Sequence, residues 1–229
     1  MDSDVRNILF LEMENARLCG EILSRTSNLL AILSKTIAAK DRATKLHSVR
    51  VTKYSMMIGR QLGLPEEEME LVYQGALLHD LGKIGISDNV LLKPDKLTLT
   101  EFETIQDHPK IGARILQAAP QFKAIVPTVL YHHERFDGRG YPNGLREVEI
   151  PLHARIICVS DSFEAMTASR PYRKAVSVEY AIDELRLHSG TQFDPEIVQA
   201  FIDAMKNNKF KRSLTRGCLE NRLRKRYNL

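Results

Sequence analysis

The run His79-Asp80-Leu81-Gly82-Lys83-Ile84-Gly85 contains a histidine directly followed by an aspartate. The imidazole can bind one metal ion through nitrogen, while the two carboxylate oxygens can bridge to a second ion. Two-metal hydrolytic sites need such a bridge, because their ions lie roughly 3.5–4 Å apart. This dipeptide therefore suggests a binuclear hydrolytic centre.

Other candidate ligands stand in distinctive settings. Asp161 follows the apolar stretch 155–159, and His132-His133 precede a glycine-rich loop. Burying an unpaired carboxylate costs several kcal/mol, so such residues are paired, hydrogen-bonded or bound to a metal. Taken singly, His47 is more often a hydrogen-bonded core residue than a ligand. With His108 the set favours a metal site, and imidazole and carboxylate ligands suit Fe, Mn, Zn or Ni rather than Ca.

The elements that must position these residues are nearly all helices, because helical spacing of apolar residues dominates the chain. We expect one helical domain over 41–205, preceded by a helix over 1–40 and followed by a basic tail over 206–229. Expected helices lie at 44–62, 66–80, 100–118, 121–133, 151–168, 177–189 and 194–206. The segments 87–99 and 136–151 are expected to be loops. His153 and His188 are interpreted as structural or surface residues.

The N-terminal helix carries a heptad pattern. Ile8, Asn15, Ile22 and Leu29 lie seven residues apart, and Leu11, Leu18 and Ile32 occupy the second apolar position. Sustained heptads with one polar Asn favour a coiled-coil homodimer. The alternative is a single helix packed on its own domain.

Composition is that of a globular protein, with 43% hydrophobic and 27% charged residues and no apolar run of bilayer length. The net charge of +4 is uneven, because 206–229 holds nine Lys or Arg and one Glu. Such a tail is more often a solvated helix than a nucleic-acid or membrane contact, so neither partner is favoured. Cys19, Cys158 and Cys218 are widely separated, which indicates a reducing, cytoplasmic setting.

From about residue 41 to 205 the chain resembles an HD-GYP domain, a bacterial branch of the HD metal-dependent phosphohydrolases. The matching motifs are HSVRV (47–51), HDLGKIGI (79–86), HP (108–109), HHER (132–135), DGRGYP (137–142), DSFEAMT (161–167), RPYR (170–173) and GTQFDP (190–195). The resemblance implies an all-α, single-domain HD-type fold.

The resemblance also implies a function, the hydrolysis of cyclic di-GMP to pGpG and onward to GMP. In that reading, one metal ion is held by His47, His79, Asp80 and Asp161. Asp80 bridges to a second ion, held by His108, His132 and His133. The two divalent ions, Fe or Mn, would activate a hydroxide for attack on phosphorus.

Three basic residues are expected to act on the substrate. Lys83, on a continuing helix, would face the same pocket as His79 and contact phosphate or serve as general acid. Arg170 and Arg173 are expected substrate contacts, since forked guanidiniums suit phosphate and stack on guanine. Their alternative role is in salt bridges. Residues 138–144, around the GYP sequence, are expected to shape the pocket or a partner surface.

Two positions depart from the family pattern. Some relatives carry Glu where this chain has Ala43 and hold a third metal, so a two-metal site is expected here. Glu164 replaces a common Asp, and its extra methylene is expected to weaken any support that it gives to a ligand.

Two other functions stay open at this point. The domain could be a receptor that binds cyclic di-GMP and signals to a partner, or an HD phosphohydrolase acting on another nucleotide. An upstream sensor is an expected partner, because the N-terminal helix could carry its signal whether the chain stands alone or is the output half of a longer protein.

Overall fold

The computed structural model of the protein describes residues 3–40, 42–169 and 175–207. Its helices, in chain order, are α1 (Ser3–Lys40), α2 (Arg42–Gln61), α3 (Glu66–Leu78), α4 (Asp88–Leu91), α5 (Leu99–Gln106), α6 (His108–Gln117), α7 (Val126–Tyr131), α8 (Leu152–Thr167), α9 (Val178–Leu187) and α10 (Pro195–Lys206), with 3-10 turns η1 (Leu81–Gly85), η2 (Pro120–Ile125) and η3 (Glu147–Glu149). No β-strand occurs in these ranges, which confirms the expected all-α class.

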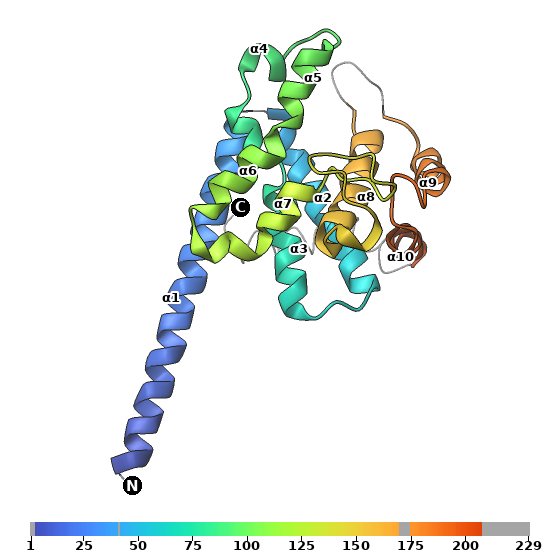
Figure 1. Cartoon of the computed structure of the whole chain (residues 1–229). Coiled ribbons are helices and arrows are strands. Elements are labelled where there is room, and N and C mark those ends of the chain that lie inside the picture. Colours follow the sequence, from blue (N-terminus) through green and yellow to red (C-terminus); the bar gives the residue numbers. More distant parts are fainter. Residues whose placement is uncertain (1–2, 41, 170–174, 208–229) are drawn as a thin grey trace.

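Helix α1 is continuous over 38 residues, and its N-terminal part projects away from the other helices (Figure 1). Leu30, Ala31 and Ile37, near its C-terminal end, are buried. This end packs against α2, α3 and η1. The helix is therefore part of the domain core at one end and unsupported at the other.

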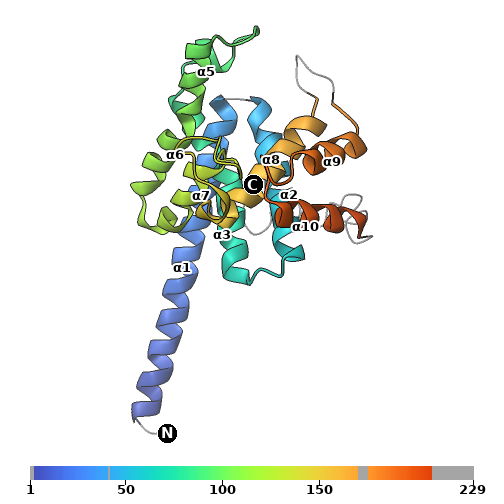
Figure 2. The same cartoon turned by 45° about the vertical axis from the view of Figure 1, so that its right-hand side comes forward.

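Helices α2, α3 and α8 form the centre of the domain, with α9 and α10 on one side and α6 and α7 on the other (Figure 2). Phe163 and Phe201 are fully buried and meet edge to face, with ring centroids 4.7 Å apart. Tyr54 of α2 packs edge-on against both rings. Each large buried side chain contributes about 1.5–3 kcal/mol to folding, so these contacts hold α2 and α8 in a defined position.

The segment 100–118 was expected to be one helix, and this prediction is wrong. It is divided at Asp107 into α5 and α6, and Pro109 stands in the first turn of α6. Pro109 cannot donate a hydrogen bond to the carbonyl group of Ile105, and that carbonyl instead contacts His108 Nδ1 at 2.7 Å. Similarly, 121–133 begins as the 3-10 turn η2 before α7, and the expected loop 87–99 contains the short helix α4.

The helix expected to run to Asp80 ends at Leu78, and the chain continues as the 3-10 turn η1. Lys83 therefore does not lie on a continuation of the helix that leads to His79. The turn passes so close to α6 that a Cβ atom on Gly82 would lie 1.8 Å from the His108 carbonyl oxygen. Only glycine fits this approach of η1 to α6.

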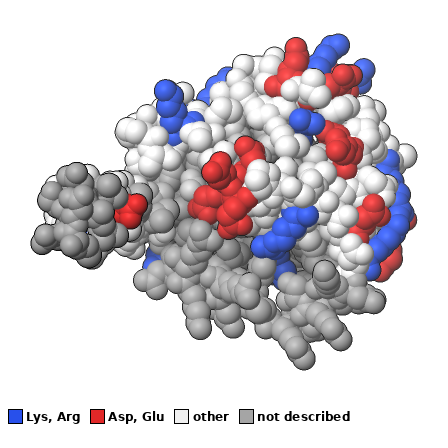
Figure 3. Space-filling model, turned by 90° about the horizontal axis from the view of Figure 1, so that it is seen from below, with Lys and Arg blue, Asp and Glu red and all other residues white. Residues whose placement is uncertain are grey.

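None of the helices in the described ranges is long and apolar enough to cross a membrane. On the face in Figure 3, acidic and basic side chains are interspersed with uncharged ones rather than joined into one basic surface. The predicted basic tail, 206–229, lies outside the described residues beyond Asn207.

Candidate metal centre

Three of the predicted histidine ligands lie at helix boundaries. His79 is the C-terminal cap of α3, His132 is the C-terminal cap of α7, and His108 opens α6 directly after the end of α5. The last carbonyl groups of a helix have no partner within the helix. A side chain that turns back at such a boundary therefore finds an acceptor close by.

Each of these three imidazoles uses that acceptor in the same way. The Nδ1 atoms of His79, His108 and His132 contact the carbonyl oxygen three residues earlier in the chain, at 2.8, 2.7 and 2.7 Å. A carbonyl only accepts, so Nδ1 carries the proton and Nε2 presents a lone pair. Such a bond sets the tautomer and the ring direction that a metal ligand requires.

The first cluster joins residues of α2, the α3 boundary and α8. The Nε2 atoms of His47 and His79 lie 3.3 Å apart. The Asp161 Oδ1 atom lies 3.2 Å from His47 Nε2, and the Asp80 Oδ2 atom lies 3.6 Å from it. These four side chains, from three separate parts of the chain, turn their ligand atoms toward one small volume.

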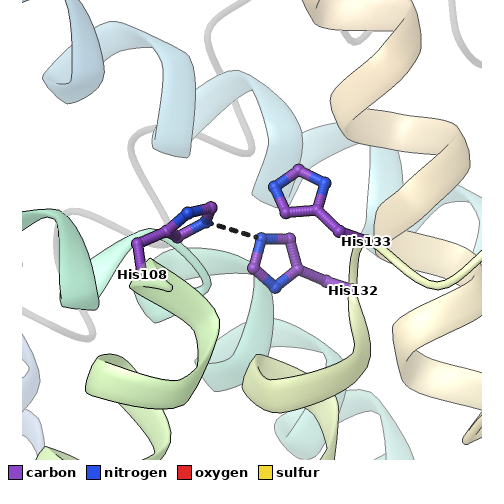
Figure 4. Close-up of side chains that lie close together, drawn as sticks. All are labelled: His108, His132 and His133. Atoms are coloured by element: carbon purple, nitrogen blue, oxygen red, sulfur yellow. Dashed lines mark hydrogen bonds between the residues drawn. The ribbon is translucent and has the colours of Figure 1, made fainter. Parts of the chain in front are cut away.

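The second cluster consists of His108, His132 and His133, whose ligand atoms lie within 4.8 Å of one another. Figure 4 shows the three rings turned toward one another, with His108 reaching across from α6. The Nε2 atoms of His108 and His132 are 3.3 Å apart. Two ligands about 2.1 Å from one ion, at an angle of about 90–110°, would be about 3.0–3.4 Å apart.

Asp80 lies between the two clusters and turns a different oxygen to each. Its Oδ2 atom is 3.5 Å from His79 Nε2, and its Oδ1 atom is 3.5 Å from His108 Nε2. The side chain is buried, at 3% relative exposure, and Lys83 Nζ donates to Oδ2 at 2.7 Å. This is the arrangement that a bridging carboxylate requires.

The donor set fits positively charged ions. His108 and His132 both present an Nε2 lone pair at the 3.3 Å contact, because their protons are on Nδ1. No proton is available to join these atoms, and a cation bound by both lone pairs would make their approach favourable. Burial lowers the pKa of His132 well below its usual value and that of His108 to about 3, which keeps both imidazoles neutral.

The first cluster is more strongly anionic. Burial opposes charge on His47, but hydrogen bonds to Asp161 and Glu164 outweigh it and raise the pKa of His47 to about 10. Burial also opposes the charged forms of Asp80 and Asp161, yet neighbouring cationic groups hold the pKa of each carboxyl well below its usual range. Positive charge is therefore favoured at this position, either as a proton on His47 or as a metal ion.

Glu164 supports His47 from behind. Its Oε2 atom lies 2.6 Å from His47 Nδ1, and Arg50 donates to the other carboxylate oxygen at 3.1 Å. The longer side chain reaches His47, and the expectation that its additional methylene weakens this support stays a prediction. Arg50 holds one oxygen of the buried carboxylate while the other reaches the imidazole, so the additional methylene is accommodated.

Replacing Glu164 with alanine should lower metal affinity by about 10–100-fold, because the loss of a carboxylate behind a ligand histidine typically has that effect. Glu164→Asp should produce an intermediate loss, since the shorter side chain withdraws from His47. Metal titration by calorimetry measures both variants. Exposed Glu103→Ala is the matched control and should bind as the unaltered protein does, whereas an unchanged affinity in Glu164→Ala would contradict the supporting role.

The loop around the GYP sequence folds back over the second cluster. The Tyr141 ring stacks on the His133 ring, with centroids 4.9 Å apart and planes 30° apart. A Cβ atom on Gly140 would lie 2.3 Å from the Arg135 backbone nitrogen, so only glycine fits this approach. Buried Glu134 accepts from the backbone nitrogens of Asn143 and Gly144 at 2.7 and 3.1 Å. The loop thus limits the movement of His133.

A cavity of about 240 Å³ opens beside the histidines. It is lined by Gln106, His132, His133, Arg135, Arg139, Gly140, Tyr141, Cys158, Asp161, Ser162 and Gln192. Sequence reasoning did not single out Gln106, Arg139, Ser162 or Gln192 as site residues. Arg139, Ser162 and Gln192 each belong to a matching motif, which was the only available signal, whereas Gln106 belongs to none. Burial raises the pKa of Cys158 to about 12, which favours the neutral thiol over the thiolate near neutral pH.

Five residues named in the sequence analysis are not part of the two clusters as the structure describes them. Arg170, Arg173 and the Ala43 side chain lie outside the described residues. His153 contacts Glu68 at 2.6 Å, and half-exposed His188 lies 3.6 Å from Glu184, so both are placed apart from the two clusters.

Comparison with known proteins gives the following matches. A family model described as "HD domain" matches residues 31–197. The cyclic di-GMP phosphodiesterase response regulator RpfG of Xanthomonas campestris is 38% identical over 205 residues, which cover 88% of this chain and 54% of that protein. A cyclic di-GMP phosphodiesterase of Thermotoga maritima is 42% identical over 175 residues, or 76% of this chain and 48% of the relative. The chain thus spans about half the length of these two proteins.

A solved structure of a cyclic GMP-AMP specific phosphodiesterase from V. cholerae has the same fold, with a TM-score of 0.66 and 22% identity. The match covers 86% of this chain and 52% of that one. It supports the all-α fold.

Proposed function

Because this chain belongs to the HD domain family, in its HD-GYP branch, we propose that it is a metal-dependent phosphodiesterase that opens cyclic di-GMP. The observation that carries the proposal is Asp80, which turns one carboxylate oxygen to each histidine cluster. Relatives named for this activity support the choice of substrate. The expected products are pGpG and then GMP.

The proposed ligands of one ion are His47, His79, Asp80 and Asp161, and those of the second are Asp80, His108, His132 and His133. Imidazole and carboxylate ligands suit Fe, Mn, Zn or Ni, and the family resemblance leads us to propose Fe or Mn. When bound, two such ions would lower the pKa of a water molecule and stabilise charge on the phosphate. The protein holds the ligand atoms in place, through the backbone carbonyls behind His79, His108 and His132 and through Glu164 behind His47.

The test is anaerobic purification with metal analysis, followed by separation of the products from cyclic di-GMP with added Mn or Fe(II). Appearance of pGpG or GMP is the expected result. Intact substrate with metal and nucleotide bound would instead favour a receptor. Hydrolysis confined to other nucleotides would favour a broader phosphohydrolase. Fractionation of cells expressing the chain would test the expected cytoplasmic location.

Lys83 is the proposed cation for the phosphate at this centre. Its side chain is only 22% exposed, and its ammonium group donates to Asp80 Oδ2 at 2.7 Å, so it lies at the edge of the ligand set. From there it could contact a phosphate oxygen or protonate the leaving oxygen. Arg170 and Arg173 remain predicted substrate contacts.

Lys83→Gln should lower kcat by about 10²-fold or more, because a positioned general acid typically contributes 10²–10⁴-fold. Lys83→Arg keeps the charge and should recover phosphate binding, seen as a KM close to that of the unaltered protein. Exposed Lys110→Gln, on α6, is the matched control. Equal kcat in Lys83→Gln and in the control would remove Lys83 from the reaction.

The proposed partner of α1 is a second copy of this chain. Leu11, Leu18, Ile22, Leu29 and Ile32 are 38–61% exposed on this helix, which leaves its heptad face without a neighbour in the described protein. Arg17 pairs with Glu14 and Glu21 along the same helix. A parallel two-stranded coiled coil would cover the apolar positions and leave these ion pairs at its edge.

Leu18→Glu should convert the expected dimer into a monomer, because it places like charges opposite each other in the apolar seam. Light scattering after size-exclusion chromatography measures the mass directly. Ser24→Glu adds the same charge on an exposed position outside the seam and should remain dimeric. A monomeric unaltered protein at concentrations of about 100 μM would contradict this assembly.

A further inference from the structure

The cavity beside the second cluster has room for one part of a cyclic dinucleotide. Its volume of about 240 Å³ is below the roughly 300–1,000 Å³ of pockets that enclose a whole drug-sized ligand. The metal ligands His132, His133 and Asp161 form one part of its wall. The remaining polar lining comes from the loop 135–140, from α5, from α8 and from the turn before α10. A ligand bound to the metals would therefore extend part of itself into this polar end.

Arg135 does not offer its full guanidinium to a ligand. Its Nε and one terminal nitrogen donate to the two oxygens of Asp137 at 3.2 and 2.9 Å. The other terminal nitrogen donates to Gln192 Oε1 at 3.1 Å. Arg135 therefore acts mainly as a brace between the loop and the turn before α10.

This brace determines which way the Gln192 amide faces. Arginine has donors only, so the amide atom turned to it must be the oxygen. The two N–H groups of Gln192 then remain for other acceptors, and within the described ranges they donate to no residue. The position is secured by the backbone, since Phe136 N donates to Gln192 O at 3.2 Å and Asp137 N donates to Thr191 O at 2.7 Å.

Arg139 adds a second group of donors to the same cavity. Its backbone nitrogen donates to Asp137 Oδ1 at 3.1 Å, which ties the residue to the brace. Among the described residues, its guanidinium forms no hydrogen bond or ion pair. The neighbouring Gly140 cannot move inward or accept a side chain, because its contacts with 133–135 are already close. The backbone of Arg139 is therefore held in place, and its guanidinium group can donate hydrogen bonds to a ligand.

The polar end of the cavity is therefore rich in donors. Guanine presents two acceptors, O6 and N7, on one edge, whereas adenine presents N7 together with the N6 amino donor. Donors from Arg139 and Gln192 match the guanine edge. With adenine, one of these protein donors would face the N6 amino group, which is itself a donor.

We propose that Arg139 and Gln192 form a base-selecting subsite that prefers guanine to adenine. The inference rests on the proposed phosphodiesterase function and names the group that determines its choice among cyclic dinucleotides. Arg135 and Asp137 are positioning residues in it, since they act by orienting Gln192 and Arg139.

Gln192→Glu and Arg139→Ala test the subsite. The glutamate keeps an oxygen for Arg135 but replaces the free N–H donors with an acceptor, so it reverses the hydrogen-bonding pattern with little change of shape. Exposed Gln121→Glu, outside the cavity lining, is the matched control. The measurement is kcat/KM for cyclic di-GMP, 3′3′-cyclic GMP-AMP and cyclic di-AMP with each protein.

The expected result is a guanine preference in the unaltered protein and the control. In each subsite variant the ratio of cyclic di-GMP to cyclic di-AMP rates should fall by about 10–100-fold, mainly through KM, as expected for the loss of a specific base contact. An unchanged ratio in both variants, with cyclic di-GMP still hydrolysed, would overturn the subsite and leave the proposed function intact.

Binding of GMP and AMP, measured by calorimetry, separates the two proposals. A preference for GMP that Gln192→Glu removes, in a protein that hydrolyses no cyclic dinucleotide, would support the subsite and overturn the phosphodiesterase proposal. Equal binding of GMP and AMP by the unaltered protein would overturn the subsite. Thermal melting of each variant checks that it is folded.

Discussion

Asp80→Ala should remove metal binding at both clusters and reduce cyclic di-GMP hydrolysis by about 10³-fold or more. The reason is that one carboxylate serves two sites, with Oδ2 at 3.5 Å from His79 Nε2 and Oδ1 at 3.5 Å from His108 Nε2. Several kcal/mol of charge stabilisation by metal ions would be lost, and each 1.4 kcal/mol corresponds to a factor of ten in rate.

Metal content and thermal stability give a result that does not depend on activity. Metal at about 100 times its dissociation constant should stabilise the unaltered protein by about 2.7 kcal/mol, and Asp80→Ala should lack this increase in Tm. Asp80→Asn, which keeps the shape and one oxygen, should retain at most one ion. Asp183→Ala removes an exposed carboxylate and should behave as the unaltered protein. Two retained ions and a normal rate in Asp80→Ala would refute the bridging role.

Gly82→Ala should destabilise the protein by about 3 kcal/mol or more, the upper part of the range for inserting atoms where there is no space. The added Cβ would lie 1.8 Å from the His108 carbonyl oxygen and 2.5 Å from the Gly112 backbone nitrogen. Both neighbours are backbone atoms, which cannot rotate away as a flexible side chain can. The turn η1 and helix α6 must therefore separate.

The same separation should weaken metal binding, because η1 directly follows Asp80 and α6 begins with His108. Denaturant unfolding and metal titration measure the two effects. Gly20→Ala is the matched control, since no atom lies within 4 Å of its added Cβ, and it should stabilise helix α1 by about 0.5–1 kcal/mol. A free energy of unfolding for Gly82→Ala within about 1 kcal/mol of that of the unaltered protein would contradict the prediction. It would show that η1 and α6 can move apart at little cost.

Both predictions concern distances between parts of the chain that sequence reasoning could not measure. The resemblance identified which residue types to expect, and the structure brings His47, His79, Asp80, His108, His132, His133 and Asp161 together. It also gives residues of the motifs partners that the motifs do not name. Gln192 contacts Arg135 across 57 positions, and Glu164 contacts His47 across 117. Such pairs depend on how helices pack, which the spacing of residues within one segment does not specify.

The sequence by itself determined the helical class, since apolar spacing is a local property of each segment. Its motifs also indicated the HD-GYP family, which the comparisons confirm. Local structure explains part of the site as well, because the imidazoles of His79, His108 and His132 bond carbonyls only three residues away. These features need no information about distant parts of the chain.

Only the tertiary structure decided the relations between helices. It set the close approach of η1 to α6 at Gly82, where the His108 carbonyl leaves no space for a Cβ atom. It placed the oxygens of Asp80 between two clusters and the amide of Gln192 in the cavity beside them. The physical reason is that packing brings together side chains from distant segments, and their contacts depend on the interlocking of whole helices rather than on any one of them.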